Sequence, residues 1–164
     1  MEQSIKLFVP LGTQKFPFNR LIVALNALVE NDIYHPNEIM MQSSIYEVTP
    51  IFKHCTLIPN EEFNDYIKQS EVIITHSGVN SIISCMKLHK PLIIVPRMKC
   101  FGEHVDDHQV EIAELMKHKF NVLVVKDMKD LQQSINIVKK HTYKDWISHS
   151  NTLISSIKDI IEQL

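Results

Sequence analysis

Residues 71–96 read EVIITHSGVNSIISCMKLHKPLIIVP. An apolar run ends in a His-Ser-Gly turn, a segment with helical spacing follows, and a second apolar run ends the stretch. Continuous apolar strands that alternate with short helices are typical of a parallel sheet covered on both faces. We therefore predict a doubly wound, Rossmann-like α/β domain.

The same strand-then-helix order recurs along the chain. The other pairs are 4–13 with 18–31, 54–59 with 61–70, 91–96 with 106–118, and 120–125 with 128–141. Residues 38–42 are a further candidate strand, and 43–53 are expected to form a loop. In such sheets ligands bind outside the carboxyl ends of the strands, so the loops after the strands are the expected site.

The composition limits the class of protein. A chain of 164 residues suits one domain, 1–164, and its net charge of −2 gives no basic field for nucleic acid. No apolar run approaches the ~20 residues needed to cross a bilayer, and no secretory signal is recognised at the start. We expect a cytoplasmic protein whose three cysteines are reduced thiols.

Glycine usage points to particular loops. The chain has three glycines, although average usage of about 7% would give about 11. Gly12, Gly78 and Gly102 each follow a predicted strand, where the backbone must turn tightly or approach a ligand closely. These loops form one candidate site.

Two of these loops offer backbone amides to a phosphate. In THSGVNS, residues 75–81, a helix opening near Asn80 or Ser81 would present free N–H groups to a diphosphate. The alternative is that Asn80 or Ser81 only caps the helix, while His76 fills a polar gap. Gly12 and Thr13 offer similar amides, or form only a turn into the next helix.

The third loop, RMKCFGEHVDDHQVEIA at 97–113, is crowded with polar groups. Asp106 as N-cap and Gln109 three residues later fit a capping box. This leaves Arg97, Glu103 and His104 unexplained. Cys100, His104 and His108 have ligand chemistry, but Gly102 and the expected helix start argue against one helical face, so we predict no metal site.

Three motifs together resemble a known family. VIITHSGVNSII, KPLIIVPR and FGEHVDDHQVEIAE, preceded by PLGTQKFPFNRLI, resemble the C-terminal, donor-binding domain of family 28 glycosyltransferases over residues 5 to about 125. More narrowly, they resemble small subunits of bacterial exopolysaccharide and capsule synthesis. These are similar to the catalytic subunit of the dolichol-linked N-acetylglucosamine transferase.

The resemblance implies one lobe of a GT-B enzyme that binds a UDP-sugar without a metal or cofactor. It implies an inverting hexosyl transfer to a lipid-linked saccharide, with a membrane-anchored partner that supplies the base and holds the chain at the inner face of the membrane. The residues expected around the donor are Gly12, Thr13, His76, Ser77, Gly78, Val79, Asn80, Ser81, Arg97, Glu103, His104, Asp107, His108 and Gln109. Among them, Asp107, His108 and Gln109 are expected near the sugar hydroxyls.

The chain also departs from the family pattern. Ser84 stands where many relatives carry a glutamate for the ribose hydroxyls, and Glu103 is a candidate substitute. This departure leaves a non-catalytic, nucleotide-sugar-binding or stabilising subunit as the alternative. An apolar stripe over 143–164 predicts a C-terminal amphipathic helix that packs on its own domain or on the partner.

Overall fold

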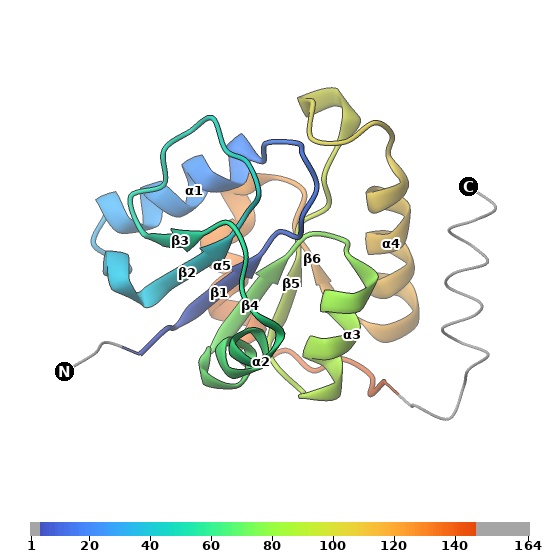
Figure 1. Cartoon of the computed structure of the whole chain (residues 1–164). Helices are drawn as coiled ribbons and strands as arrows, with labels where there is room; N and C mark the ends of the chain where they lie inside the picture. The colour runs from blue at the N-terminus through green and yellow to red at the C-terminus, as the bar shows by residue number, and fades with distance from the viewer. Residues whose placement is uncertain (1–3, 147–164) are drawn as a thin grey trace.

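The computed structural model describes residues 4–146 and contains one six-stranded sheet with the order β3-β2-β1-β4-β5-β6 (Figure 1). All neighbouring strands run parallel. The strands are β1 Leu7–Pro10, β2 Ile39–Gln42, β3 Lys53–Cys55, β4 Val72–Thr75, β5 Leu92–Ile94 and β6 Leu123–Val124. The doubly wound parallel sheet predicted from the sequence is confirmed, including the strand at 38–42.

Five α-helices in the described chain cover the two faces of the sheet (Figure 1). They are α1 Asn19–Glu30, α2 Asn60–Gln69, α3 Val79–Lys87, α4 His108–Phe120 and α5 Leu131–Val138. Helices α1 and α5 share one apolar core with the sheet, and α2, α3 and α4 share the other. In α1 the buried Leu21, Leu25 and Leu28 recur at three- and four-residue steps, so one stripe of the helix faces the sheet.

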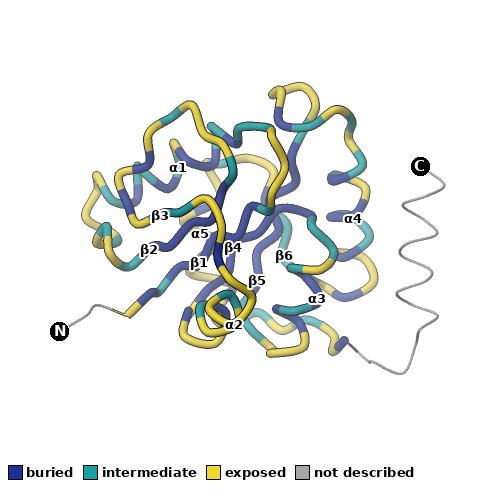
Figure 2. The backbone as a smooth tube through the Cα atoms, in the orientation of Figure 1, coloured by how far each residue is buried: buried dark blue, intermediate teal, exposed yellow. Residues whose placement is uncertain are grey.

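The central strands are buried along their whole length because helices cover both of their faces. Figure 2 shows the sheet as the buried centre of the molecule. All four residues of β1, and all four of β4, are buried. This explains why these strands read as continuous apolar runs rather than as an alternating pattern.

The strand order reverses between β1 and β4. From β1 the chain moves outward through β2 to β3, and it then returns to β4 and moves outward through β5 to β6. After β1 and after β4 the chain therefore continues to opposite faces of the sheet, into α1 and α3 respectively. In open α/β sheets this switch point forms the crevice in which ligands bind.

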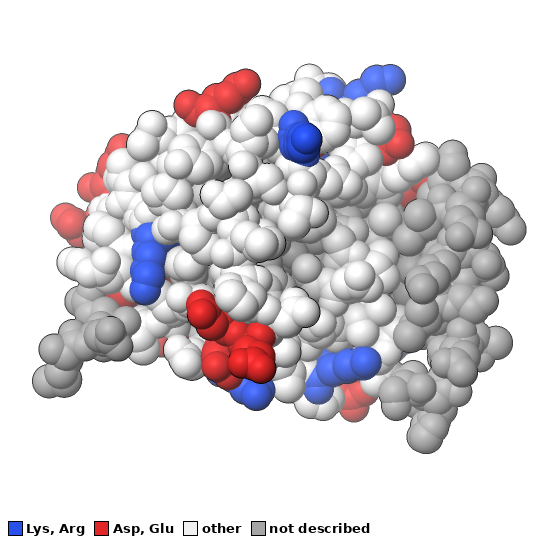
Figure 3. Space-filling model, viewed as in Figure 1, with Lys and Arg blue, Asp and Glu red and all other residues white. Residues whose placement is uncertain are grey.

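One half of the sheet is less covered. In the described chain β2 and β3 are joined by the irregular residues 43–52, as predicted, and α1 covers only one face of these strands. Charged side chains are scattered over the face seen in Figure 3, with an acidic group over α2 where Glu61 and Glu62 open the helix. Among residues 4–146, no helix combines the length and apolar character required for a transmembrane span.

Candidate functional site

Gly12 and Gly78 meet at the switch point, on either side of the His76 ring. A Cβ built on Gly12 would lie 2.8 Å from His76 Nε2, and one built on Gly78 would lie 2.6 Å from the same nitrogen. Gly12 also has a φ of +73°, which side-chain-bearing residues rarely adopt. The loops after β1 and β4 therefore approach each other as closely as they do because both positions lack a side chain.

His76 is buried at the end of β4 and is uncharged. Its side chain is 7% exposed, and Gln109 Nε2 lies 3.3 Å from its Nδ1. Burial, followed by the positive charge of Arg97, lowers the pKa of His76 to about 3. From the sequence, His76 could belong to a phosphate-binding loop or only fill a polar gap. The structure shows a buried ring with one edge between Gly12 and Gly78.

Helix α3 begins at this point with free backbone donors. Its N-cap is Gly78, no side chain caps it, and its first backbone bond runs from Ile82 N to Gly78 O. The alternative in which Asn80 or Ser81 caps the helix is wrong, because both lie inside the first turn. Among the described residues no acceptor is recorded for the amides of Val79, Asn80 and Ser81, which carry the positive end of the helix dipole.

Arg97 lies beneath the loops rather than on their surface. It is 1% exposed, and its guanidinium donates to Phe16 O at 2.7 Å and to Leu11 O at 3.1 Å. Burial lowers the pKa of Arg97 to about 10, against the raising effect of Glu103, so the group stays charged near neutrality. Its hydrogen bonds hold the loop after β1, and its contact with the donor stays a prediction.

The carboxylate of Glu103 is also hydrogen-bonded within the chain. Its carboxylate is 2% exposed, accepts from Arg20 Nε at 2.7 Å and accepts from the Met98 amide at 2.9 Å. Arg20 also donates to Pro96 O and to Lys126 O, so it links the loop after β1 to the loops after β5 and β6. Both carboxylate oxygens are thus bonded within the chain, and a role of Glu103 at the ribose stays a prediction.

The start of α4 differs from the predicted capping box. The N-cap is Asp107 rather than Asp106, and Gln109 turns inward, where its Oε1 accepts from Arg97 N at 3.0 Å. Asp106 instead lies between two histidines, 2.9 Å from His104 Nδ1 and 3.1 Å from His108 Nδ1. Gln109 is 5% exposed, and its placement at the sugar hydroxyls stays a prediction.

The remaining predicted residues divide between the surface and the interior. Thr13 and Asn80 are exposed beside Gly12 and Gly78, and Val79 and Ser81 are partly exposed. Ser77 is buried and donates to Gln109 O at 2.6 Å, which ties the loop after β4 to α4. Asp107 accepts from the Lys99 amide at 3.0 Å. Within residues 4–146 no cluster of three or more His, Cys, Asp or Glu side chains is arranged to hold a metal ion.

Sequence reasoning missed Gln42. This residue ends β2, is 5% exposed, and donates from Nε2 to Gly12 O at 3.3 Å and to Thr56 O at 3.2 Å. It thereby joins the end of β2 to the loops that follow β1 and β3. The sequence signal for this residue was the side-chain amide of Gln42 at the end of an otherwise apolar strand.

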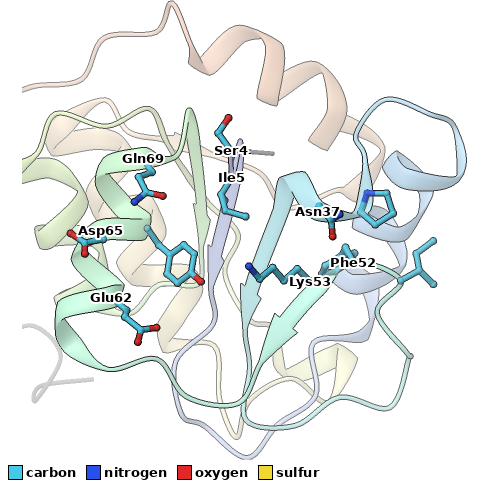
Figure 4. A pocket seen from close by; sticks show the side chains of 11 residues that line it. Ser4, Ile5, Asn37, Phe52, Lys53, Glu62, Asp65 and Gln69 are labelled. Carbon is cyan, nitrogen blue, oxygen red and sulfur yellow. The ribbon is translucent and has the colours of Figure 1, made fainter. Parts of the chain in front are cut away.

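A separate hollow in the described chain lies elsewhere. It encloses about 1420 Å³ between α2 and the less covered half of the sheet, and we call it the β2–β3 hollow (Figure 4). Lys53 lies on the sheet side, and Glu62 and Asp65 lie on α2. Its lining includes Ile5, just before β1, and Lys53, the first residue of β3, so it opens at the amino ends of the strands, opposite the glycine loops.

Comparisons with known proteins relate the chain to glycosyltransferases. The sequence profile of the glycosyltransferase family 28 C-terminal domain matches residues 6–164. The UDP-N-acetylglucosamine transferase subunit ALG13 of Candida albicans is 38% identical over 77 residues, which are 47% of this chain and 25% of that protein. The UDP-N-acetylglucosamine--N-acetylmuramyl-(pentapeptide) pyrophosphoryl-undecaprenol N-acetylglucosamine transferase of Bacteroides thetaiotaomicron is 29% identical over 119 residues, 66% of this chain and 30% of that protein.

Solved structures show the same fold at low sequence identity. The solution structure of ALG13 has a TM-score of 0.56 and 15% identity, covering 94% of this chain and 95% of that one. Spinosyn forosaminyltransferase SpnP has a TM-score of 0.56 and 16% identity, covering 98% of this chain and 40% of that one. The chain spans 25% and 30% of the two curated relatives. The chain belongs to the glycosyltransferase family 28 C-terminal domain family and has the Rossmann-like fold of one GT-B lobe.

Proposed function

We propose that this chain binds a UDP-hexose or UDP-N-acetylhexosamine in the loops after β1 and β4 and transfers the sugar together with a partner subunit. The observation that carries the proposal is the meeting of Gly12, Gly78 and the uncapped start of α3 around His76. Two loops that approach without side chains, next to free amides, suit a diphosphate. The relatives' names, which give UDP-N-acetylglucosamine as the donor, support a UDP-sugar.

The proposed chemistry is electrostatic. When the bond between the sugar and the diphosphate breaks, negative charge grows on the departing UDP. The amides of Val79, Asn80 and Ser81 would stabilise that charge, and the buried charge of Arg97 would add a positive potential from below. This arrangement needs no metal or cofactor, and we propose direct displacement with inversion at the anomeric carbon.

The base that deprotonates the acceptor is assigned to the partner. A general base works best when its pKa lies near the working pH, and the pKa of His76 is lowered to about 3. Glu103 is buried and already bound to Arg20. His76 is therefore a weak base near neutral pH, and the carboxylate of Glu103 is already bonded within the chain.

The proposed acceptor rests on the relatives' names by analogy. One relative is named for transfer to a pyrophosphoryl-undecaprenol saccharide, and another is named as a subunit. We propose a lipid-linked saccharide acceptor in exopolysaccharide or capsule synthesis and a membrane-anchored partner. That partner would hold this chain at the cytoplasmic face of the membrane.

A second candidate function is a non-catalytic subunit that binds the nucleotide sugar or stabilises its partner. One observation favours it: Ser84 replaces the expected glutamate and donates to Asn80 O at 2.9 Å, while Glu103 accepts from Arg20 and from the Met98 amide. The candidate replacement for the charged contact to the ribose is then already bonded within the chain. Losing such a contact weakens binding by roughly ten- to hundredfold.

Calorimetric titration with a panel of UDP-sugars, for the chain alone and co-purified with its partner, tests the proposal. Saturable binding of one UDP-sugar, together with sugar transfer that is lost in His76→Asn, supports the transferase. Transfer by the complex that is unaffected by His76→Asn, with the variant folded, supports the non-catalytic subunit. Absence of UDP-sugar binding in both preparations rules out the transferase and the nucleotide-sugar-binding subunit, and leaves only a subunit that stabilises its partner.

A further inference from the structure

We propose that the outer edge of β3 binds the same edge of a second copy of this chain, so that two antiparallel β3 strands join the two sheets into one. Strand β3 ends the sheet on its side, and within residues 4–146 no strand pairs with its outer edge (Figure 1). An uncovered edge is a template for pairing with another chain. The proposal does not rest on the proposed function, because it uses only groups outside the glycine loops.

The backbone of His54 faces this outer edge. The carbonyl of Cys55 accepts from Ser43 N at 3.1 Å, so the backbone groups of Cys55 face β2. Backbone groups of successive residues in a strand face opposite edges, so the N–H and C=O of His54 face outward. Two residues that lie directly opposite in an antiparallel pair exchange both N–H···O bonds. A two-fold axis at His54 therefore pairs these groups in both copies.

The segment around His54 carries apolar side chains that suit this symmetry. Ile51 and Leu57 are 42% and 69% exposed, and they lie three residues before and three residues after His54. The two-fold axis brings Ile51 of each copy to the end of the paired segment where Leu57 of the other copy lies. Pro50 and Pro59, which cannot donate to a ladder, lie outside this segment. Pairing thus buries apolar surface that a single copy exposes.

The charges on the α2 face are complementary in the same register. Lys53 lies opposite Cys55 of the second copy; Lys53 lines the β2–β3 hollow, and Cys55 packs against the core beneath α2. Glu62 also lines the hollow, and its charge, after burial, raises the pKa of Cys55. Each Lys53 therefore approaches Glu62 of the other copy.

Lysine on an edge strand often prevents pairing, but here it meets a carboxylate. Within the described part of the chain, neither Lys53 nor Glu62 belongs to a recorded ion pair. Two copies related by the axis at His54 form this pair twice. The β3 edge is thus complementary to itself in backbone hydrogen bonds, apolar contacts and charge.

Sedimentation velocity of the full chain at concentrations from roughly 1 to 300 μM tests the proposal. We expect a reversible dimer with a dissociation constant above about 10 μM, because a short strand edge buries a small area. His54→Pro removes the outward N–H while the ladder between β2 and β3 stays intact. It should raise the dissociation constant at least roughly tenfold. His54→Ala keeps the N–H and is the matched control, which should dimerise as wild type does.

Charge reversal tests the register without changing the backbone. Lys53→Glu and Glu62→Lys each replace two attractions by two repulsions and should raise the dissociation constant roughly five- to fiftyfold. The two changes combined in one chain should restore the dimer. Glu61→Lys, at the neighbouring exposed position of α2 that does not line the hollow, is the matched control and should dimerise as wild type does.

A cross-link identifies the paired residues directly. In a Cys100→Ser background, Lys53→Cys places a thiol opposite Cys55 of the second copy, at the separation that a disulfide requires. Mild oxidation should give a covalent dimer on a non-reducing gel. Adding Cys55→Ala should abolish that dimer.

Four results would overturn the proposal. Wild type that stays monomeric over the whole concentration range has no such interface. A dimer that persists in His54→Pro and in both charge-reversed variants forms through another surface. Equal loss of dimer in His54→Ala and His54→Pro excludes pairing through the backbone. A combined Lys53→Glu and Glu62→Lys chain that stays monomeric contradicts the register.

Discussion

His76 gives the folded chain a defined dependence on pH. The pKa of its ring is lowered from 6.5 to about 3, first by burial and then by Arg97. Between these values the unfolded chain binds a proton at His76 that the folded chain does not, so the free energy of unfolding decreases as the pH falls. This contribution is fully present above the unfolded pKa and is lost progressively below it.

We expect the chain to lose about 2 kcal/mol of stability through His76 between about pH 7 and pH 5. The measurement is urea unfolding of wild type and His76→Asn at both pH values. The variant should lose less stability on acidification than wild type, by about that amount. Equal losses in the two proteins would show that the folded ring takes up the proton freely.

The glycines provide a second residue-scale test, because Gly78 is restricted by space rather than by backbone geometry. A Cβ at Gly78 would lie 2.5 Å from His76 Cε1, so Gly78→Ala must displace the ring. We expect a stability loss of about 1–3 kcal/mol. In calorimetry, the affinity for UDP should fall by roughly tenfold or more, because the ring is displaced at the switch point.

Gly102→Ala is the control for this test. Gly102 has a φ of +68° but nothing within 4 Å of an added Cβ. This change should cost about 1 kcal/mol of backbone strain while the affinity for UDP stays unchanged. Equal losses of affinity in the two variants would show that UDP does not bind beside His76.

At the scale of elements, the uncapped start of α3 can be changed one donor at a time. Val79 is the first helical residue, where proline fits because its missing N–H has no partner within the helix. Gly78, with ψ of 114°, already has the extended conformation that a following proline requires. Val79→Pro should therefore remove one amide while the helix stays intact.

We expect Val79→Pro to weaken UDP binding by roughly five- to thirtyfold, since one hydrogen bond to a charged group is lost, with little change in the unfolding midpoint. Asn60→Pro, at the first position of α2, is the matched control and should bind UDP as wild type does. Calorimetry and thermal unfolding of the two variants provide the comparison. Unchanged affinity in Val79→Pro would mean that this amide does not face the ligand.

The elements were largely predictable from the sequence, whereas their caps were not. Apolar runs and helical spacing located the strands and helices because burial on both faces leaves a strong pattern. The start of α4 was misplaced by one residue, since Gln109 turns inward to Arg97 instead of closing a capping box. Short-range spacing could not reveal that partner, which reaches α4 from the loop after β5.

At the scale of the whole molecule, buried charges hold the loops around the switch point. Arg97 and Glu103 follow β5, yet their partners Phe16, Leu11 and Arg20 follow β1. Composition and loop position placed Arg97 and Glu103 near the site. Their inward direction was not predictable, because it depends on carbonyl groups that only the folded chain brings together.

Arg97→Met should therefore destabilise the chain by at least about 2 kcal/mol, because it leaves the buried carbonyl group of Leu11 and the partly buried one of Phe16 without donors. Lys53→Met, an exposed change at the edge of the sheet, should stay within about 0.5 kcal/mol of wild type. Chemical unfolding measures both. An Arg97→Met variant as stable as wild type would show that the hydrogen bonds of Arg97 do not hold the loops after β1 and β5 together.

The most direct test of the whole account is a ¹H–¹⁵N NMR titration of the chain with UDP, which reports binding residue by residue. We predict the largest shifts at Gly12, Gly78, Val79 and Asn80, and little change at Lys53 or Asp65, which line the β2–β3 hollow. Shifts concentrated at the hollow, with the glycine loops unchanged, would contradict the central claim that a nucleotide diphosphate binds at the switch point.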